Sequence, residues 1–185
     1  MTNSILLDGR SLTRAQVVAI ARQGASIRLD DAQLIQAKRA ADFLAEKVGG
    51  GEPIYGVTTG FGSNADKLLG AHRVRDELPG GNPEATEGTL LEELQRNLII
   101  THAVCVGKPF GVDVVRAMLA IRVNTLMRGH SGIRVETLRA LAELLNRHVI
   151  PALHATGPVG ASGALAPRPH LALFLSGCGQ PSAAV

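Results

Sequence analysis

The stretch HATGPVGASGALAP, residues 154–167, interrupts a chain whose hydrophobic pattern is otherwise mainly helical. At its centre stand three small residues in a row, Ala161, Ser162 and Gly163. Glycine has no Cβ to block an approach and tolerates unusual dihedral angles, so in a strained turn the amide nitrogen of Gly163 can attack the carbonyl carbon of Ala161. Loss of the Ser162 hydroxyl as water would then leave an electrophile made from the backbone. Taken alone, the tripeptide is more often part of an ordinary turn, because a chain rich in alanine and glycine will contain it by chance.

The composition indicates one globular domain. The chain has 185 residues, of which 45% are hydrophobic and 19% charged, with a formal net charge of +3 and no cluster of Lys and Arg. This argues against nucleic acid as a partner. Cys105 and Cys178 lie far apart and the histidines show no metal-ligand spacing, so neither a disulfide nor a metal is expected. Since there is no secretory leader pattern and no apolar run long enough to span a membrane, we expect a cytoplasmic protein without membrane contact.

Hydrophobic periodicity predicts a series of helices joined by short loops. Thr13 and Gln16 form a capping-box pattern before the first helix, which should end at Gly24. Asp30 is suited to cap a second helix, which the glycines from Gly49 onward should end. Further helices are expected over residues 87 to about 106, 111–129, 134–149 and from 169 onward. The apolar start of the last helix suggests that its packing partners are missing; the alternative is a terminal helix docked on the others.

A second unusual loop is YGVTTGFG, Tyr55 to Gly62. Its glycines do not belong to a phosphate-binding loop, because neither G-K-[ST] nor G-x-G-x-x-G is present. Tyr55 is the only tyrosine of the chain. A phenol needs nearby positive charge or hydrogen-bond donors to act as a base near neutral pH. The ordinary alternative is a tyrosine that buries its ring in the core.

Four segments occur in an order that resembles the N-terminal region of the histidine/phenylalanine ammonia-lyase family: YGVTTGFG, LQRNLIITHAVCVGKP, VNTLMRGHSGIR and GPVGASGALAP. The resemblance extends from about Leu6 to Gly177. It implies a mainly α fold with short strands and loops, corresponding to the region that carries the prosthetic group in the L-aspartase-like helical fold. Residues 1–185 would form that single region, and the central and C-terminal helical bundle of the family would be absent.

The resemblance also implies the chemistry. In this family Ala-Ser-Gly cyclises autocatalytically to 4-methylideneimidazol-5-one (MIO), and the matching precursor here is Ala161, Ser162 and Gly163. No metal or nucleotide is involved. MIO makes the amino group of an aromatic L-amino acid a better leaving group, and a base removes a β-proton, which yields ammonia and a trans-arylacrylate. Tyr55 matches the family's catalytic base.

Substrate binding is implied at three further positions. Gly62 belongs to the tyrosine loop, and the pair Thr101 and His102 stands where the family selects the side chain of its substrate. Thr-His is closer to the pair of histidine lyases, although it also resembles some tyrosine aminomutases, while other segments resemble phenylalanine lyases. Without the resemblance, His102 would equally be a helix histidine bonded to a backbone carbonyl. The family assembles as a homotetramer, whose subunits share each active site.

The chain departs from the family pattern around the tripeptide. Ala164 stands where the family has Asp, Pro158 replaces a small residue, and Arg168 and Pro169 replace apolar and small residues. Three readings therefore stay open: an incomplete or truncated lyase of histidine, phenylalanine or tyrosine, a related aminomutase, and a catalytically silent folded fragment or association module. An unrelated helical domain is the remaining alternative. In the truncated chain, an exposed apolar face would favour self-association.

Overall fold

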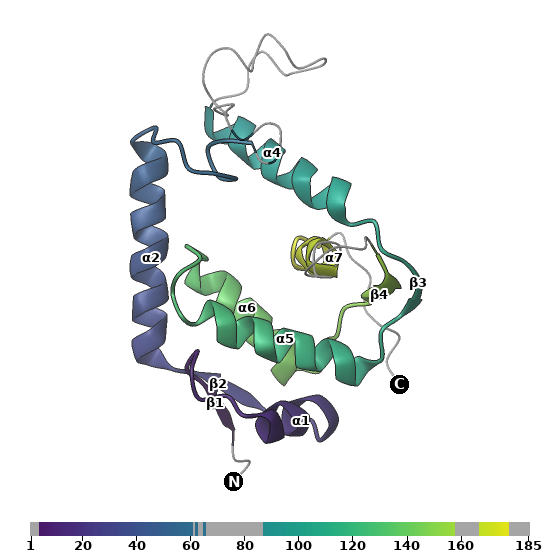
Figure 1. Ribbon diagram of the computed structural model, residues 1–185. Helices are drawn as coiled ribbons and strands as arrows, with labels where there is room; N and C mark the ends of the chain where they lie inside the picture. Colours follow the sequence, from purple (N-terminus) through teal and green to yellow (C-terminus); the bar gives the residue numbers. More distant parts are fainter. Residues whose placement is uncertain (1–3, 61, 63–64, 66–86, 158–166, 178–185) are drawn as a thin grey trace. The chain divides into compact units, whose positions relative to one another are not determined.

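The computed structural model describes residues 4–60, 62, 65, 87–157 and 167–177. The chain divides into two compact units, one made of residues 1–43 and 102–185 and the other of residues 44–101 (Figure 1). Each unit is described by itself below. The fold is mainly helical with short strands, as the sequence predicts.

The first unit begins with a strand–helix–strand arrangement. β1 (Ile5–Leu7) pairs in parallel with β2 (Ile27–Leu29), and α1 (Arg14–Arg22) connects them. The predicted capping box is confirmed: Gln16 N donates to the Thr13 hydroxyl, and Thr13 N donates to the Gln16 side-chain carbonyl. Because Thr13 and Gln16 satisfy amide groups that lack partners within the helix, they fix the residue at which α1 starts.

The core of this unit lies around α5 (Val112–Leu126), which contacts both α1 and α6 (Val135–Asn146). The buried residues of α5 and α6 recur every three or four positions, which is the periodicity of one helix face. From α5 and α6 they include Val115, Leu119, Val123, Leu138, Leu141 and Leu145. The helix that the sequence predicts within residues 134–149 is therefore confirmed.

One charged side chain is buried among these helices. Arg116 of α5 is only 3% exposed. Its Nε donates to the carbonyl of Ile20 at 2.8 Å and its Nη1 to the carbonyl of Leu145 at 3.1 Å. Both carbonyls belong to the last turns of helices, α1 and α6, which carry partial negative charge. Arg116 thus ties the C-terminal ends of two helices to the centre of a third.

A two-stranded antiparallel sheet and a helix complete the first unit. β3 (Val106–Pro109) pairs antiparallel with β4 (His154–Thr156), and α7 (Pro167–Leu175) follows. The helix expected from residue 87 to about 106 is too long, because α4 (Glu87–His102) ends earlier and Val106 begins β3. Gly107 has a φ of +81°, a conformation that does not continue a right-handed helix.

The second unit contains the C-terminal part of α2 (Asp31–Gly49), the turn that follows it, and α4 up to Thr101. The predicted end of α2 at Gly49 is confirmed. Within the described part of the chain, no helix is both long and apolar enough to cross a membrane.

Candidate functional site

The loop that carries Tyr55 is built around the carbonyl of Ile54. The backbone N–H groups of Val57, Thr58 and Thr59 all point to this oxygen, at 3.0, 3.0 and 3.2 Å. Such convergence makes a tight turn that exposes the residue immediately after Ile54. The sequence marks this segment as a loop, but it does not indicate which carbonyl organises it.

Two buried threonines support the turn from inside. The Thr58 hydroxyl donates to the carbonyl of Glu52 at 2.6 Å and accepts from Ile54 N at 2.7 Å. The Thr59 hydroxyl donates to the carbonyl of Gly60 at 2.9 Å. The position of Thr58 and Thr59 between the glycines of YGVTTGFG is the available signal in the sequence, because a hydroxyl beside an irregular backbone commonly bonds to it.

Tyr55 lies on the outside of this turn, with its side chain 68% exposed. The ordinary alternative of a tyrosine buried in the core is therefore wrong. Gly62 N donates to the Tyr55 phenol oxygen at 3.3 Å. Gly56 and Gly62 have φ values of +71° and +60°, which favour glycine at both positions. The structure thus brings together two of the predicted site residues, Tyr55 and Gly62, through the hydrogen bond from the Gly62 N–H to the phenol oxygen.

The pair Thr101 and His102 ends α4. The Thr101 hydroxyl lies 2.7 Å from the carbonyl of Asn97 and 3.2 Å from that of Leu98, the usual back-bonding of a helical threonine. His102 is partly buried. Thr101 belongs to the same unit as Tyr55, and His102 is the first residue of the other unit's second segment.

Ala161, Ser162 and Gly163 lie outside the described residues, as do the neighbouring departures Pro158 and Ala164. The segments on both sides of the tripeptide are described. On one side, His154 of β4 lies with its Nδ1 2.7 Å from the carbonyl of Gly107. On the other side, Cys105 N donates to Nε2 of His170 in α7 at 2.9 Å. Both flanks are therefore attached to the chain around β3.

The two flanking histidines also lie near each other, with ring centroids 6.0 Å apart in an edge-on arrangement. Burial, and then the nearby His154, lower the pKa of His170. This agrees with its role as a hydrogen-bond acceptor, because only the neutral ring has a lone pair at Nε2. Burial likewise raises the pKa of the Cys105 thiol.

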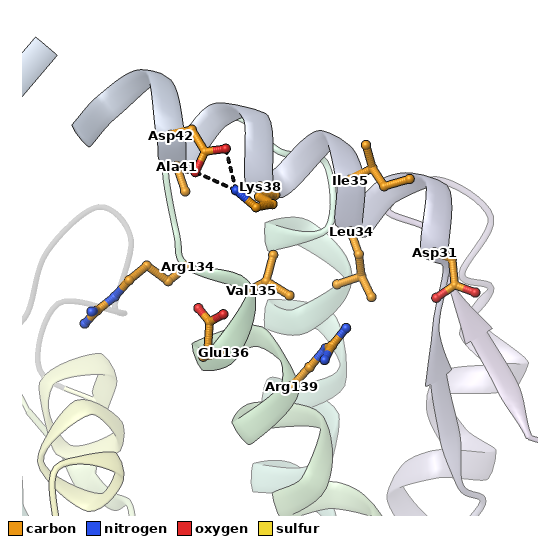
Figure 2. A pocket seen from close by; sticks show the side chains of 10 residues that line it. All are labelled: Asp31, Leu34, Ile35, Lys38, Ala41, Asp42, Arg134, Val135, Glu136 and Arg139. Atoms are coloured by element: carbon orange, nitrogen blue, oxygen red, sulfur yellow. Dashed lines mark hydrogen bonds and ion pairs between the residues drawn. The ribbon is translucent and has the colours of Figure 1, made fainter. Parts of the chain in front are cut away.

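A separate cavity of about 580 Å³ lies between α2 and the start of α6 (Figure 2). Glu136 and Arg139 extend from α6 toward α2, whereas Lys38 and Asp42 of α2 are paired with each other at 2.6 Å. The predicted site residues that the structure describes, Tyr55, Gly62, Thr101 and His102, do not line this cavity. Its mixture of opposite charges favours no single class of ligand, so we do not assign the function to it.

Comparison with known proteins identifies the family. The sequence profile described as aromatic amino acid lyase matches residues 12–183, which is most of the chain. The chain belongs to the aromatic amino acid lyase family. The histidine ammonia-lyase of Gloeobacter violaceus is 42% identical over 180 residues, which cover 97% of this chain and 32% of that enzyme. The chain thus spans about a third of the length of the lyases that it matches.

Solved structures confirm the fold prediction. The tyrosine aminomutase from Streptomyces globisporus superposes with a TM-score of 0.78 at 30% identity, covering 97% of this chain and 31% of that one. The histidine ammonia-lyase from Trypanosoma cruzi gives a TM-score of 0.70 at 33% identity, covering 92% and 29% respectively. The described helices and short strands correspond to the N-terminal part of these lyase and aminomutase structures.

Proposed function

We propose that this chain carries the MIO-forming segment and the catalytic base of an enzyme that eliminates ammonia from an aromatic L-amino acid without oxidation, giving a trans-arylacrylate. The observation that carries the proposal is the exposed Tyr55 with Gly62 N donating to its phenol oxygen, in a chain of the aromatic amino acid lyase family. Histidine, phenylalanine and tyrosine are the candidate substrates.

The family uses MIO, which supplies an electrophile that unmodified side chains lack, and the residues that would form it here are Ala161, Ser162 and Gly163. The chemistry of the tripeptide fits, because Gly163 offers an unhindered amide nitrogen. The attachment of His154 and His170 to the chain around β3 supports the proposal, since it fixes described residues on both sides of the tripeptide in sequence. Ala164 in place of Asp is the feature of the sequence that speaks against maturation.

Tyr55 would accept the β-proton of the substrate at its phenol oxygen while the bond between Cα and nitrogen breaks and ammonia leaves. The Gly62 N–H holds that oxygen in place and stabilises negative charge on it. Tyr55 exposes 68% of its side chain, so a substrate can reach it.

For the substrate's ring, we assign the polar contact to His102 rather than Thr101. The Thr101 hydroxyl already lies within bonding distance of two backbone carbonyls, and a hydroxyl has only one proton to donate. An imidazole at position 102 suits a substrate ring that is itself polar. The 42% identity to a histidine ammonia-lyase supports histidine as the first substrate to test.

The whole-enzyme assembly is also a proposal. The chain spans about a third of the length of its relatives. We propose that activity requires several chains to associate as a homotetramer, as in the family. The ligand would be a small aromatic amino acid. That residues 1–185 form a single region, and that the protein is cytoplasmic, stay predictions.

The test is an incubation of the chain with L-histidine, L-phenylalanine and L-tyrosine in turn, with arylacrylate followed by its near-ultraviolet absorbance. We expect product from one substrate, none from Tyr55→Phe or Ser162→Ala, and unchanged product from the matched control Ser176→Ala, whose hydroxyl donates to the carbonyl of Leu173. A β-amino acid as the only product would instead identify an aminomutase. If no substrate gives product, the proposal is wrong and the chain is a catalytically silent fragment.

A further inference from the structure

A cavity of about 270 Å³ lies between α5 and the beginning of α7, apart from the tyrosine loop. Apolar side chains form most of its wall, among them Met118, Leu153 and Leu171. Arg122 of α5 and Arg168 of α7 contribute charged groups to the same cavity. Its size is near the lower limit for small-molecule sites, which begin at about 300 Å³.

The two arginines have no acidic partner among the described residues. The ion pairs found there join Arg22 to Asp113, Lys38 to Asp42, Lys47 to Glu52 and Arg147 to Glu143. No Asp or Glu is among the described residues that line the cavity. Burial, and then the like charge of Arg168, lower the pKa of Arg122. Arg122 is half-buried and Arg168 is exposed to solvent, so two positive charges line a largely apolar cavity with no acidic side chain beside them among the described residues.

Such an arrangement is complementary to one class of ligand. A carboxylate can accept hydrogen bonds from both guanidinium groups and remove their mutual repulsion. The apolar wall gains from covering a compact apolar body, which an inorganic anion does not have.

We propose that the cavity lined by Arg122, Arg168, Met118, Leu153 and Leu171 binds a small organic monocarboxylate with an apolar body. The described residues of the proposed lyase site, Tyr55, Gly62, Thr101 and His102, do not line this cavity. The volume suits a single ring bearing one carboxylate. The Thr125 hydroxyl at the same cavity donates to the carbonyl of Ile121 at 2.8 Å, so the arginines supply the donors for the ligand.

The test is a chemical-shift titration of the purified chain with benzoate, which is not an arylacrylate. Benzamide serves as its uncharged isostere and inorganic phosphate as an anion without an apolar body. We expect benzoate to shift the methyl signals of Leu153 and Leu171, with benzamide and phosphate each binding at least about tenfold more weakly. Tyr55→Phe should leave the benzoate titration unchanged, which separates this site from the proposed function.

Two variants decide the role of the arginine. Arg168→Leu should weaken benzoate binding at least about tenfold, whereas Arg10→Leu, the same replacement at an exposed position outside the cavity, should not. Arg168→Lys keeps the charge and tests the bidentate contact if the leucine variant does not fold. Equal binding by Arg168→Leu and Arg10→Leu, phosphate binding as tight as benzoate, or no shift of either leucine would overturn the proposal. Self-association through Arg168 without any binding of benzoate would also overturn it, because a carboxylate of a second copy would then occupy the cavity.

Discussion

Gly62 N donates to the phenol oxygen of Tyr55 at 3.3 Å, and Gly62 itself has a φ of +60°. The relationship links a backbone conformation that favours glycine to the position of the only tyrosine in the chain. A Cβ at position 62 would meet nothing within 4 Å, so steric crowding does not require glycine there. The positive φ angle does.

Replacing Gly62 by alanine should therefore loosen the loop without creating a clash. The cost of a left-handed conformation for alanine is about 1–2 kcal/mol. We expect amide hydrogen exchange over residues 54–60 to accelerate at least about fivefold. Gly49→Ala is the matched control, because its Cβ also meets nothing but its φ is not positive. Equal exchange rates in the two variants would contradict this explanation.

Thr58 should be essential to the same turn. Valine at this position removes the hydroxyl that joins Ile54 N to the carbonyl of Glu52, and it leaves both groups without that partner. The expected loss is about 1–3 kcal/mol in the free energy of opening of residues 52–60, measured by hydrogen exchange. Thr137→Val in α6, where no side-chain bond needs the hydroxyl, should change global stability by less than about 0.5 kcal/mol. A Thr58→Val protein with unchanged exchange would show that the threonine does not support the turn.

Arg116 should be the most sensitive charged residue of the first unit. Methionine fills a similar volume but removes the hydrogen bonds that the guanidinium group donates to the carbonyls of Ile20 and Leu145. We expect the free energy of unfolding in urea to fall by about 3 kcal/mol or more. Arg139→Met on the exposed side of α6 should lie within about 0.5 kcal/mol of the original chain. If both variants unfold at the same urea concentration, the buried arginine does not stabilise the two helix ends.

The pKa of His170 predicts how stability depends on pH. Since the folded-state pKa lies below the unfolded value of about 6.5, the unfolded chain takes up a proton first as the pH falls. This contribution to stability is therefore present above about pH 6.5 and is lost as the pH decreases through the lowered value. His170→Gln keeps an acceptor for Cys105 N and should flatten the dependence of the urea midpoint on pH. His130→Gln, at an exposed position, should not; an equally steep decline in the His170→Gln protein would contradict the assignment.

The sequence predicted correctly those helix ends that are determined by residues close together in the chain. The capping box of Thr13 and Gln16 and the glycine end of α2 were read correctly because the residues involved are neighbours in sequence. α4 was predicted too long, because the apolar spacing to Cys105 continues past the point where Gly107 bends the backbone. The β1–β2 pairing could not be located from strands of three residues that lie apart in sequence.

The candidate site shows the same division. Tyr55 and Gly62 share one loop motif, so the sequence could place them together, and the hydrogen bond between them agrees with that. The supporting bonds of Thr58 depend on the backbone path, which no spacing rule supplies. The buried position of Arg116 depends on carbonyls far away in the sequence, at Ile20 and Leu145. Arg122 and Arg168 have no acidic partner among the described residues. Their proximity likewise could not be predicted from the sequence, because it depends on α5 and α7 lining one cavity.

The central claim, that the backbone of Ala161, Ser162 and Gly163 closes into a ring, is tested most directly by the intact mass of the purified chain. We predict a mass lower than that of the sequence by two molecules of water, together with an added near-ultraviolet absorbance. Ser162→Ala should show neither change, and Ser176→Ala should show both. An original chain with the full mass of its sequence and no added absorbance would contradict the account.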